Sequence, residues 1–360
     1  MDLLLRGIAI LLVSVILITF LLSMARTTLL NRRRRDPLLS LATRFVHAIV
    51  VKLARKRKSD EDVARVTVWY MPLFVLILIS IWFSVVLFAF AILYWESAAE
   101  TTFFDSLISS GSALSTLGFD TPSTPQGQVI AIIEGAFGLM IVIFFFSFIP
   151  GYQSTMLARD VRTAWLYERV GPTPTGIDVL LWLYQNMAEN EHDDFWASWE
   201  DWFRQLRVTH VLAPEVIYTP SSFSNQSWVV CSHALLDAAA FHLAAVDKRS
   251  VAAPHLCMKV GASAMREVSA TLGFAPDHLP APPTGLPAPP DGQPTEAQFV
   301  AGIEQLKAAG VPVAASDAEA WAQFSGMHAV YGPPLHHIFE QTLTRRYPGL
   351  LTTKKSTLPE

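Results

Sequence analysis

The sequence predicts an all-α membrane protein with an N-terminal membrane anchor, a helix pair that encloses a re-entrant loop, and a helical C-terminal domain. Three observations predict this class. The chain is 51% hydrophobic, yet its long apolar runs lie within the first 150 residues. Residues 103–127 lie between two of these runs and contain no Lys or Arg. The residues after 150 show helical periodicity and little strand alternation.

An N-terminal transmembrane anchor is expected over residues 1–25. Residues 7–24 are almost uncharged and long enough to cross a bilayer. Residues 23–25, Ser-Met-Ala, offer the alternative of a signal-peptide cleavage site. The positive charge follows the run, at Arg26 and at 32–35, rather than preceding it. Because positive residues stay in the cytoplasm, we expect an uncleaved anchor with its N-terminus outside.

Residues 26–66 form a basic segment. Between Arg26 and Arg65 there are 12 basic and 4 acidic residues. Within it, 38–53 has an apolar stripe at helical spacing but is too short and too charged to span comfortably. We expect it at the inner interface, with 55–58 against anionic lipid headgroups. Two interpretations stay open: a helix that couples the cytosol to the membrane domain, and a stop-transfer flank.

The outer helix is predicted over 68–95. Trp69-Tyr70 and Tyr94-Trp95 bracket it as interfacial aromatic belts. A helix of this length rises about 42 Å, more than the ~30 Å hydrocarbon core. It therefore tilts or extends beyond the bilayer.

A short helix is predicted from Asp105, as its N-terminal cap, to Ser115. It leads into Thr116-Leu117-Gly118-Phe119-Asp120, and a second apolar helix starts near residue 128. A helix that enters between two spans and returns as extended chain is a re-entrant loop. Such backbone is tolerated at that depth only beside protein or a water-filled path.

This loop resembles the pore loop of tetrameric potassium channels, which has the pattern F-x-D-[AS]-L followed by T-V-G-Y-G-D. Gly127 and Gly138 also fall where that family has a Gly before the inner helix and a hinge Gly within it. The resemblance implies a channel module over 67–151, with the pore helix and filter at 103–120. The residues that carry it are Phe103, Asp105, Ser106, Leu107, Ser115, Thr116, Leu117, Gly118 and Phe119.

The physical requirements of a filter agree with this resemblance. A cation that crosses hydrocarbon must exchange its water shell for other oxygens, which consecutive backbone carbonyls provide. Carbonyls of neighbouring residues share a side only where some residues adopt φ > 0, which Gly118 allows most cheaply. The Thr116 hydroxyl is a candidate inner ligand.

Asp120 stands where potassium channels keep a second Gly. Asp tolerates the left-handed region better than most residues, so the strand can still close. Gly-Phe-Asp-Thr-Pro also resembles the Gly-Glu-Thr-Pro of poorly selective, cyclic-nucleotide-gated cation channels. The Asp120 carboxylate either points outward and concentrates cations, or faces the ion path and weakens selectivity. Thr121-Pro122 favours the outward orientation.

The inner helix is predicted over 128–149, ending at Pro150-Gly151. Glu134 is its one ionisable residue, and such residues inside a membrane are functional by default. We expect it to bind a pore-helix hydroxyl behind the filter or to face the upper cavity; reaching outer water is the third alternative. Helical spacing from the hinge at Gly138 predicts a lumen-facing gate or cavity row, namely Leu139, Val142 and Phe146.

Residues 152–360 are expected to form a cytosolic helical domain with a Pro-rich linker over 276–294. Helices are predicted at 153–169, 177–190, 195–207, 227–246, 296–309 and 318–339, with 227–246 as the buried central helix. The Trp residues of 196–203 are expected in the core or a subunit interface. Cys231 and Cys257 suit a reducing cytoplasm.

His233 and Asp237 lie four residues apart and share a helix face, which is half of a metal site. Without a visible partner pair, a satisfied buried polar contact is the favoured interpretation, and no metal site is predicted. A second Thr-Leu-Gly-Phe, at 271–274, lacks membrane flanks and is a coincidence. No nucleophile elbow, P-loop or Cys cluster appears, so an enzyme is not expected.

The sequence therefore predicts a homotetrameric, potassium-conducting channel of the inner membrane, with K⁺ as permeant ion, no other cofactor and no nucleic-acid partner. The alternative within the class is a non-selective cation channel. The alternative from another class is a non-conducting, membrane-anchored signalling or scaffold protein. The sequence does not specify the gating stimulus or a cytosolic ligand.

Overall fold

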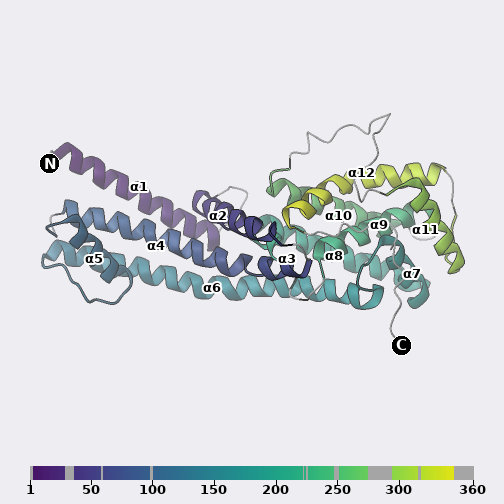
Figure 1. Cartoon of the computed structure of the whole chain (residues 1–360), viewed down its shortest axis with the longest axis horizontal. Helices are drawn as coiled ribbons and strands as arrows, with labels where there is room; N and C mark the ends of the chain where they lie inside the picture. Colours follow the sequence, from purple (N-terminus) through teal and green to yellow (C-terminus); the bar gives the residue numbers. More distant parts are fainter. Residues whose placement is uncertain are drawn as a thin grey trace. The chain divides into compact units, whose positions relative to one another are not determined.

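The computed structural model describes residues 3–28, 36–57, 60–97, 100–221, 223, 226–246, 251–274, 294–314 and 318–343. The Pro-rich linker expected over 276–294 lies outside these ranges except for Pro294. The described residues form α-helices and two short 3₁₀ helices (Figure 1). Within them, the only strand-type pairing is an isolated bridge between Val246 and Val313. The predicted all-α class is confirmed.

The chain divides into two compact units. Unit 1 comprises Met1–Lys52 and Trp69–Ser154, and unit 2 comprises Leu53–Val68 and Thr155–Glu360. The helices of unit 1 are α1 (Leu3–Thr28), α2 (Pro37–Ala54, up to residue 52), α4 (Tyr70–Glu96), α5 (Phe103–Leu114) and the first part of α6 (Pro125–Val170).

Aromatic side chains hold the long helices of unit 1 together. Phe20 of α1 packs against Trp82 of α4 and Phe137 of α6, with ring centroids 5.9 and 5.8 Å apart. Trp82 also meets Phe144 of α6 at 4.5 Å, and Phe90 meets Phe137 at 5.5 Å. Such pairs add to the burial of apolar area. They fix α1, α4 and α6 side by side, and the shorter α5 packs against α4 and α6.

Helix α2 is joined to α1 by a buried cap. Asp36 accepts hydrogen bonds from the backbone amides of Leu38 and Leu39, both at 3.0 Å, and from the Ser23 hydroxyl at 2.9 Å. One face of α2 is buried, at Leu39, Ala42, Val46 and Val50, whereas Leu41 and Phe45 remain exposed. The helix is thus amphipathic, as its stripe indicates.

Helix α6 differs from the expectation, because we expected Pro150-Gly151 to end the inner helix. Instead the helix continues through Pro150 to Val170. A proline inside a helix removes one hydrogen bond and usually kinks or breaks it. Here Pro150 is exposed and the next residues form helical turns whose apolar side chains pack in unit 2, with Leu166 fully buried.

The remaining helices belong to unit 2. They are α3 (Asp60–Thr67), α7 (Gly176–Asn186), α8 (His192–Leu212), α9 (Trp228–Ala245), α10 (Ala252–Thr271), α11 (Glu296–Ala308) and α12 (Ala318–Gln341). All 18 residues of α9 are buried, which confirms the predicted central helix. Trp196, Trp199 and Trp202 of α8 lie in the same core.

Helices α3 and α10 were not predicted. The Thr-Leu-Gly-Phe at 271–274 is the end of α10, where Gly273 adopts φ +100° and the Phe274 amide donates to the Ser269 carbonyl at 3.1 Å. This is the geometry of a helix C-cap. Cys231 and Cys257 are free and buried.

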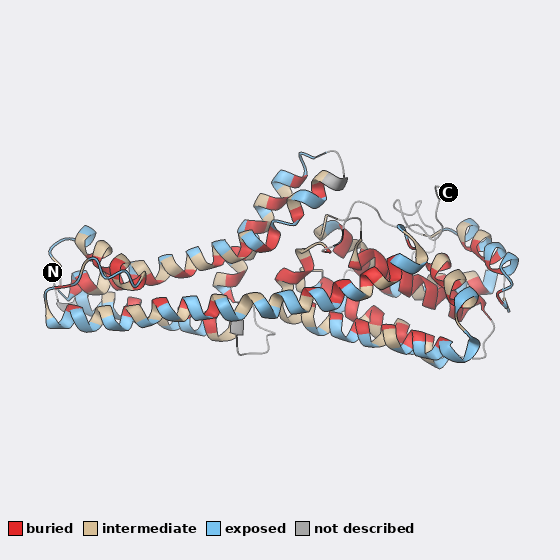
Figure 2. Ribbon diagram, turned by 90° about the horizontal axis from the view of Figure 1, so that it is seen from below, coloured by how far each residue is buried: buried red, intermediate tan, exposed pale blue. Residues whose placement is uncertain are grey.

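Among the residues that the structure describes, five helices are long and apolar enough to cross a membrane, which indicates a multi-pass membrane protein. They lie within Arg6–Arg26, Pro37–Ala54, Asp62–Glu96, Pro125–Val170 and Trp228–Ala245. The first four bury only 22–33% of their most apolar windows, whereas the last is 100% buried within the protein. Figure 2 shows this contrast between the two units. We therefore treat α9 as a core helix of unit 2 and not as a span.

Candidate functional site

The candidate site is built on α5, and its N-terminal cap is Thr102. The Thr102 side chain accepts a hydrogen bond from the Asp105 amide at 3.1 Å. We expected Asp105 to be the cap, which is wrong: it lies three residues further on. There its Oδ2 accepts hydrogen bonds from the hydroxyls of Thr102 at 2.7 Å and Thr101 at 3.2 Å. A carboxylate in the first turn also suits the positive end of the helix dipole.

Four serines of α5 are fully buried, and buried hydroxyls need hydrogen-bond partners. They are Ser106, Ser109, Ser110 and Ser112. The hydroxyl of each forms a hydrogen bond with a residue outside α5. The sequence analysis singled out only Ser106 and Ser115. The signal it missed is the run of small hydroxyl residues in Ser-Leu-Ile-Ser-Ser-Gly-Ser.

The backbone after α5 donates its amides back to that helix. The Thr116 amide donates to the Ala113 carbonyl at 3.0 Å, and the amides of Leu117 and Gly118 both donate to the Ser112 carbonyl at 3.2 Å. Ser115 ends the helix, and its hydroxyl donates to the Gly111 carbonyl at 2.6 Å. The Ser112 hydroxyl is bonded to Asp120, accepting from its amide at 2.9 Å and donating to its carbonyl at 2.8 Å.

The carbonyls of the same segment have no such partners. Among the residues that the structure describes, no donor forms a hydrogen bond to the carbonyl of Thr116, Leu117, Gly118 or Phe119. Backbone carbonyls are strong acceptors that are normally satisfied. Four consecutive free carbonyls therefore offer a row of oxygen ligands, which we name the carbonyl row.

Backbone conformation aligns this row. Thr116 has φ +58° and Gly118 has φ +66°, whereas Leu117 and Phe119 are not in the positive-φ region. Alternation of this kind turns successive peptide planes so that neighbouring carbonyls face one side. For Thr, the left-handed conformation costs about 1–2 kcal/mol. Strained residues of this kind occur most often at functional sites.

Two large apolar side chains in this segment lie on the surface of the single chain. Leu117 is 72% exposed and Phe119 is 68% exposed. Exposed apolar side chains that lie close together in an ordered loop indicate a surface that another molecule covers.

The Asp120 carboxylate turns back to α5. Its Oδ2 accepts a hydrogen bond from the Ser109 hydroxyl at 2.5 Å, and the same hydroxyl lies 3.1 Å from Glu100 Oε1. Because a hydroxyl carries one proton, the two carboxyl groups share it. Asp120 is thus directed to α5 of its own chain, away from the carbonyl row.

Glu134 is buried on α6 and reaches a different face of α5 from the one that Asp120 binds. The Ser110 hydroxyl lies 2.5 Å from Glu134 Oε1 and 2.9 Å from the Leu87 carbonyl of α4. Tyr94 is a further neighbour of the carboxyl group. Of the three positions expected for Glu134, this is the first, in which the carboxyl group contacts a hydroxyl of the short helix. It links α4, α5 and α6 at one point behind the carbonyl row.

Gly138 provides a close contact between α6 and the end of α5. A Cβ atom at this position would lie 2.0 Å from the Leu114 carbonyl oxygen, which no side chain permits. The helix α6 is unbroken here, so the structure explains this glycine by the approach of two backbones. The hinge expected at Gly138 remains a prediction.

The expected lumen residues lie on the exposed surface of α6. Leu139 is 55% exposed, Val142 is 49% exposed and Phe146 is 71% exposed. Their neighbour Phe144 is buried at 3% exposure between Trp82 and Phe148. The three expected residues are therefore free to line a shared surface.

Comparison of the chain with protein-family models, with curated proteins and with solved structures found no match. The chemistry of the site is therefore argued from its geometry alone. Oxygen ligands without protons bind cations, and a row of them on extended backbone suits an ion that has lost its water shell. The C-terminal end of α5 adjoins the row, and its partial negative charge favours a cation as well.

Proposed function

We propose that the protein is a subunit of a homotetrameric cation channel and that K⁺ is its main permeant ion. The observation that carries this proposal is the carbonyl row, formed by Thr116, Leu117, Gly118 and Phe119. The amides of Thr116, Leu117 and Gly118 are bound to α5, and the carbonyls of the row are not. Residues 116–119 are exposed in the single chain, so these four acceptors are available to bind a cation in place of water.

One chain supplies the oxygens on only one side of an ion. Surrounding the ion requires several copies about an axis, and closed symmetric rings are the common solution. One re-entrant loop per chain implies four chains by analogy with the tetrameric pore-loop channels. The exposed Leu117 and Phe119 side chains support this assembly, since neighbouring copies would cover them.

The choice between a K⁺-selective and a non-selective channel depends on the orientation of the Asp120 carboxylate, because Asp120 stands where potassium channels keep a second filter glycine. In the single chain its carboxylate binds Ser109 instead of extending the carbonyl row. This supports a charge that concentrates cations at the outer mouth. A non-selective cation channel is the second candidate, because the row ends one residue early compared with potassium channels.

In this channel α1, α4 and α6 are the spans, and α2 lies at the inner interface. Leu41, Phe45 and Leu53 of α2 are 47%, 58% and 43% exposed, which suits contact with lipid. The basic segment places α2 and unit 2 in the cytoplasm and the N-terminus outside. The cell inner membrane is the proposed location. Leu139, Val142 and Phe146 line the inner cavity, where Phe146 narrows the path.

The alternative from another class is a membrane-anchored scaffold that does not conduct. Such a protein would need neither the free carbonyls nor a Thr at positive φ. Its oligomer would also not need fourfold symmetry. Size measurement in mild detergent distinguishes the two, because a monomer or dimer favours the scaffold.

The proposal is tested by cation flux into liposomes that contain the purified protein. Ala at position 118 is strained by about 1–2 kcal/mol in each chain, because φ is +66° there. Gly118→Ala should assemble as a tetramer, with flux at least tenfold below that of the wild type. Gly7→Ala is the matched control, since a Cβ atom at Gly7 meets nothing within 4 Å. Normal flux through Gly118→Ala would refute the proposed filter.

A further inference from the structure

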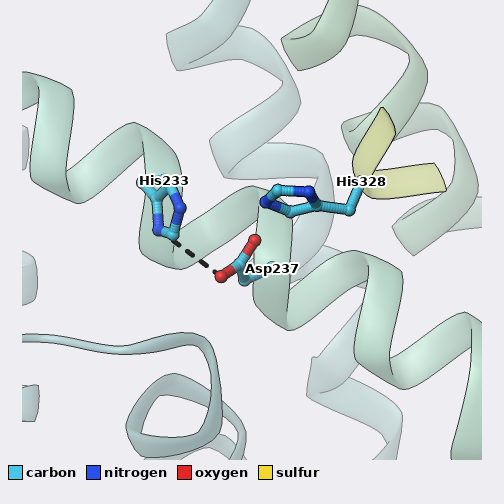
Figure 3. Close-up of side chains that lie close together, drawn as sticks. All are labelled: His233, Asp237 and His328. Atoms are coloured by element: carbon cyan, nitrogen blue, oxygen red, sulfur yellow. Dashed lines mark ion pairs between the residues drawn. The ribbon is translucent and has the colours of Figure 1, made fainter. Parts of the chain in front are cut away.

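Three side chains with metal-ligating atoms meet inside unit 2, far from the carbonyl row in sequence. They are His233 and Asp237 of α9 and His328 of α12 (Figure 3). One ligand atom from each lies within 4.8 Å of the other two. His233 Nδ1 and Asp237 Oδ2 are 3.4 Å apart. In Figure 3 the His328 ring extends from α12 toward the pair on α9.

All three residues are buried, with exposures of 1%, 0% and 7%. In the described part of the chain, Nε2 of His328 has no hydrogen-bond partner. A buried polar atom without a partner costs free energy, so native proteins rarely leave one unused. This nitrogen is directed into the cluster, where a ligand would satisfy it.

The backbone around the cluster leaves room for these side chains. A Cβ atom at Gly332 would lie 2.6 Å from Cε1 and 2.9 Å from Nδ1 of His328, so the imidazole occupies the place of a side chain at 332. A glycine inside a helix costs about 1 kcal/mol relative to alanine. Gly176 of α7 likewise allows close packing against Asp237, whose Cβ would be 2.6 Å from a Cβ at 176.

The electrostatics also suit a cation. The cluster combines one carboxylate with two imidazoles, and the carboxylate supplies negative charge that a divalent cation favours. The Tyr331 hydroxyl donates to Asp237 Oδ1 at 2.8 Å, which orients the carboxylate. Metal ligands are commonly oriented by a second hydrogen bond of this kind.

We propose that His233, Asp237 and His328 bind one divalent transition-metal ion, with Zn²⁺ as the best-suited ion. Two imidazoles and one carboxylate are a ligand set that Zn²⁺ accepts, with bonds of about 2.0–2.2 Å. Ligand atoms in such a tetrahedral site are about 3.4 Å apart. Side-chain rotations that move the three ligand atoms by about 1 Å would bring them to this spacing. A water molecule takes the fourth position.

The ion would connect two helices that are distant in the chain. Asp237 and Tyr331 already join α9 and α12 through one hydrogen bond. A metal ion adds a second link with directional bonds on both helices. Because the ion binds only the folded arrangement, it stabilises unit 2 by mass action.

The experiment measures metal binding to the full-length protein purified in detergent and stripped with EDTA. We expect one Zn²⁺ per chain by elemental analysis, and a rise of about 5 °C or more in the Tm of unit 2 at 100-fold excess over Kd. His328→Gln should reduce the affinity at least tenfold and abolish the Tm shift. His336→Gln on the same helix is the matched control, because its side chain is 44% exposed and pairs with Glu340 at the surface.

Co²⁺ provides a test that needs no variant. In the wild type, Co²⁺ should give the intense visible absorption of a tetrahedral site, and Zn²⁺ should displace it. Substoichiometric Zn²⁺ binding by the wild type, or an octahedral Co²⁺ spectrum, would overturn the proposal even if His328→Gln fails to fold. Unchanged affinity in a folded His328→Gln would overturn it as well.

Discussion

Ser112 contacts more of the candidate filter than any other residue of α5 that the structure describes. Its carbonyl accepts from the amides of Leu117 and Gly118, and its hydroxyl binds both the amide and the carbonyl of Asp120. One side chain and one carbonyl thus fix three of the residues after the helix. The geometry of the carbonyl row therefore depends on a small hydroxyl residue that fits beneath the loop.

The first prediction concerns Asp120. Its carboxylate binds Ser109, so we expect it to act as a surface charge and not as an ion ligand. Asp120→Asn should lower single-channel conductance at low salt, where the charge is least screened, and leave the K⁺/Na⁺ permeability ratio unchanged. Asp120→Gly should leave that ratio unchanged too. A low wild-type ratio that rises in Asp120→Gly would show that the carboxylate faces the ions.

A second residue-scale prediction concerns His210 of α8. The ring is fully buried, packs on Trp228 at 4.7 Å and has Nδ1 2.9 Å from the Leu206 carbonyl. Burial lowers the pKa of His210 well below 6.5, and the positive charge of Arg159 lowers it further. The unfolded chain takes up a proton below about pH 6.5 and the folded chain does not. Stability is therefore lost as the pH falls below 6.5.

His210→Phe keeps an aromatic ring on Trp228 but cannot bind a proton. Between pH 7 and pH 5, the wild type should lose about 2 kcal/mol more unfolding free energy than this variant. Chemical denaturation at several pH values measures the difference. His255→Gln, at an exposed site, is the control and should follow the wild type. Parallel pH profiles for wild type and His210→Phe would contradict the assignment.

At the scale of elements, the contact between α5 and α6 fixes the position of the end of α5 against α6. Gly138 and Gly135 lie one turn apart on α6 and both face the end of α5. A Cβ at 138 would lie 2.0 Å from the Leu114 oxygen, whereas a Cβ at 135 would lie 3.6 Å from the Ala113 oxygen. The first distance is impossible and the second is an ordinary contact.

These two glycines provide a matched pair of variants. Gly138→Ala should displace the end of α5, lower stability by about 1–3 kcal/mol and abolish cation flux. Gly135→Ala should fold and conduct, because alanine favours the helix and meets no obstruction. Thermal unfolding and liposome flux measure both effects. Equal behaviour of the two variants would contradict the packing described for Gly138.

The outer helix of unit 1 could be predicted because its apolar length and aromatic belts match the bilayer, whereas the end of α6 could not, because packing in unit 2 continues the helix through Pro150. The outer helix expected at 68–95 is α4, Tyr70–Glu96. Helix α10 gave no such signal, since its buried face consists largely of small residues. Gly261 is one of them, and a Cβ there would be 2.8 Å from Leu236 and 2.9 Å from Phe203. In the sequence, a glycine that allows close helix packing looks the same as a glycine that breaks a helix.

Only the part of the candidate site that depends on the spacing of residues within one short stretch of sequence could be predicted. The filter residues were named from one contiguous motif, whereas the positive φ of Thr116 depends on the amides bound by Ser112 and Ala113. His328 lies on α12, and only tertiary folding brings it to His233 and Asp237. The helix-to-helix hydrogen bond of Glu134 with Ser110 was expected as one of several positions, because sequence alone does not rank buried partners.

At the scale of the whole molecule, the basic segment between residues 26 and 65 is the basis for predicting the topology. It predicts an outside N-terminus, three spans and a cytoplasmic unit 2. A reporter that is active only in the cytoplasm, fused after Glu360, should be active. The same reporter fused before Met1 should be inactive. Activity of a periplasmic reporter at Glu360 would reverse the topology and place unit 2 outside.

Reversal potentials of the purified protein in planar bilayers test whether the carbonyl row conducts cations. With KCl in excess over NaCl on one side and NaCl in excess over KCl on the other, we expect the current to reverse close to the potassium equilibrium potential. Replacing chloride with a larger anion should not move the reversal. A reversal near zero with cation preference would indicate the non-selective channel. Absence of current from incorporated tetramers, or a reversal that follows chloride, would contradict a cation pore.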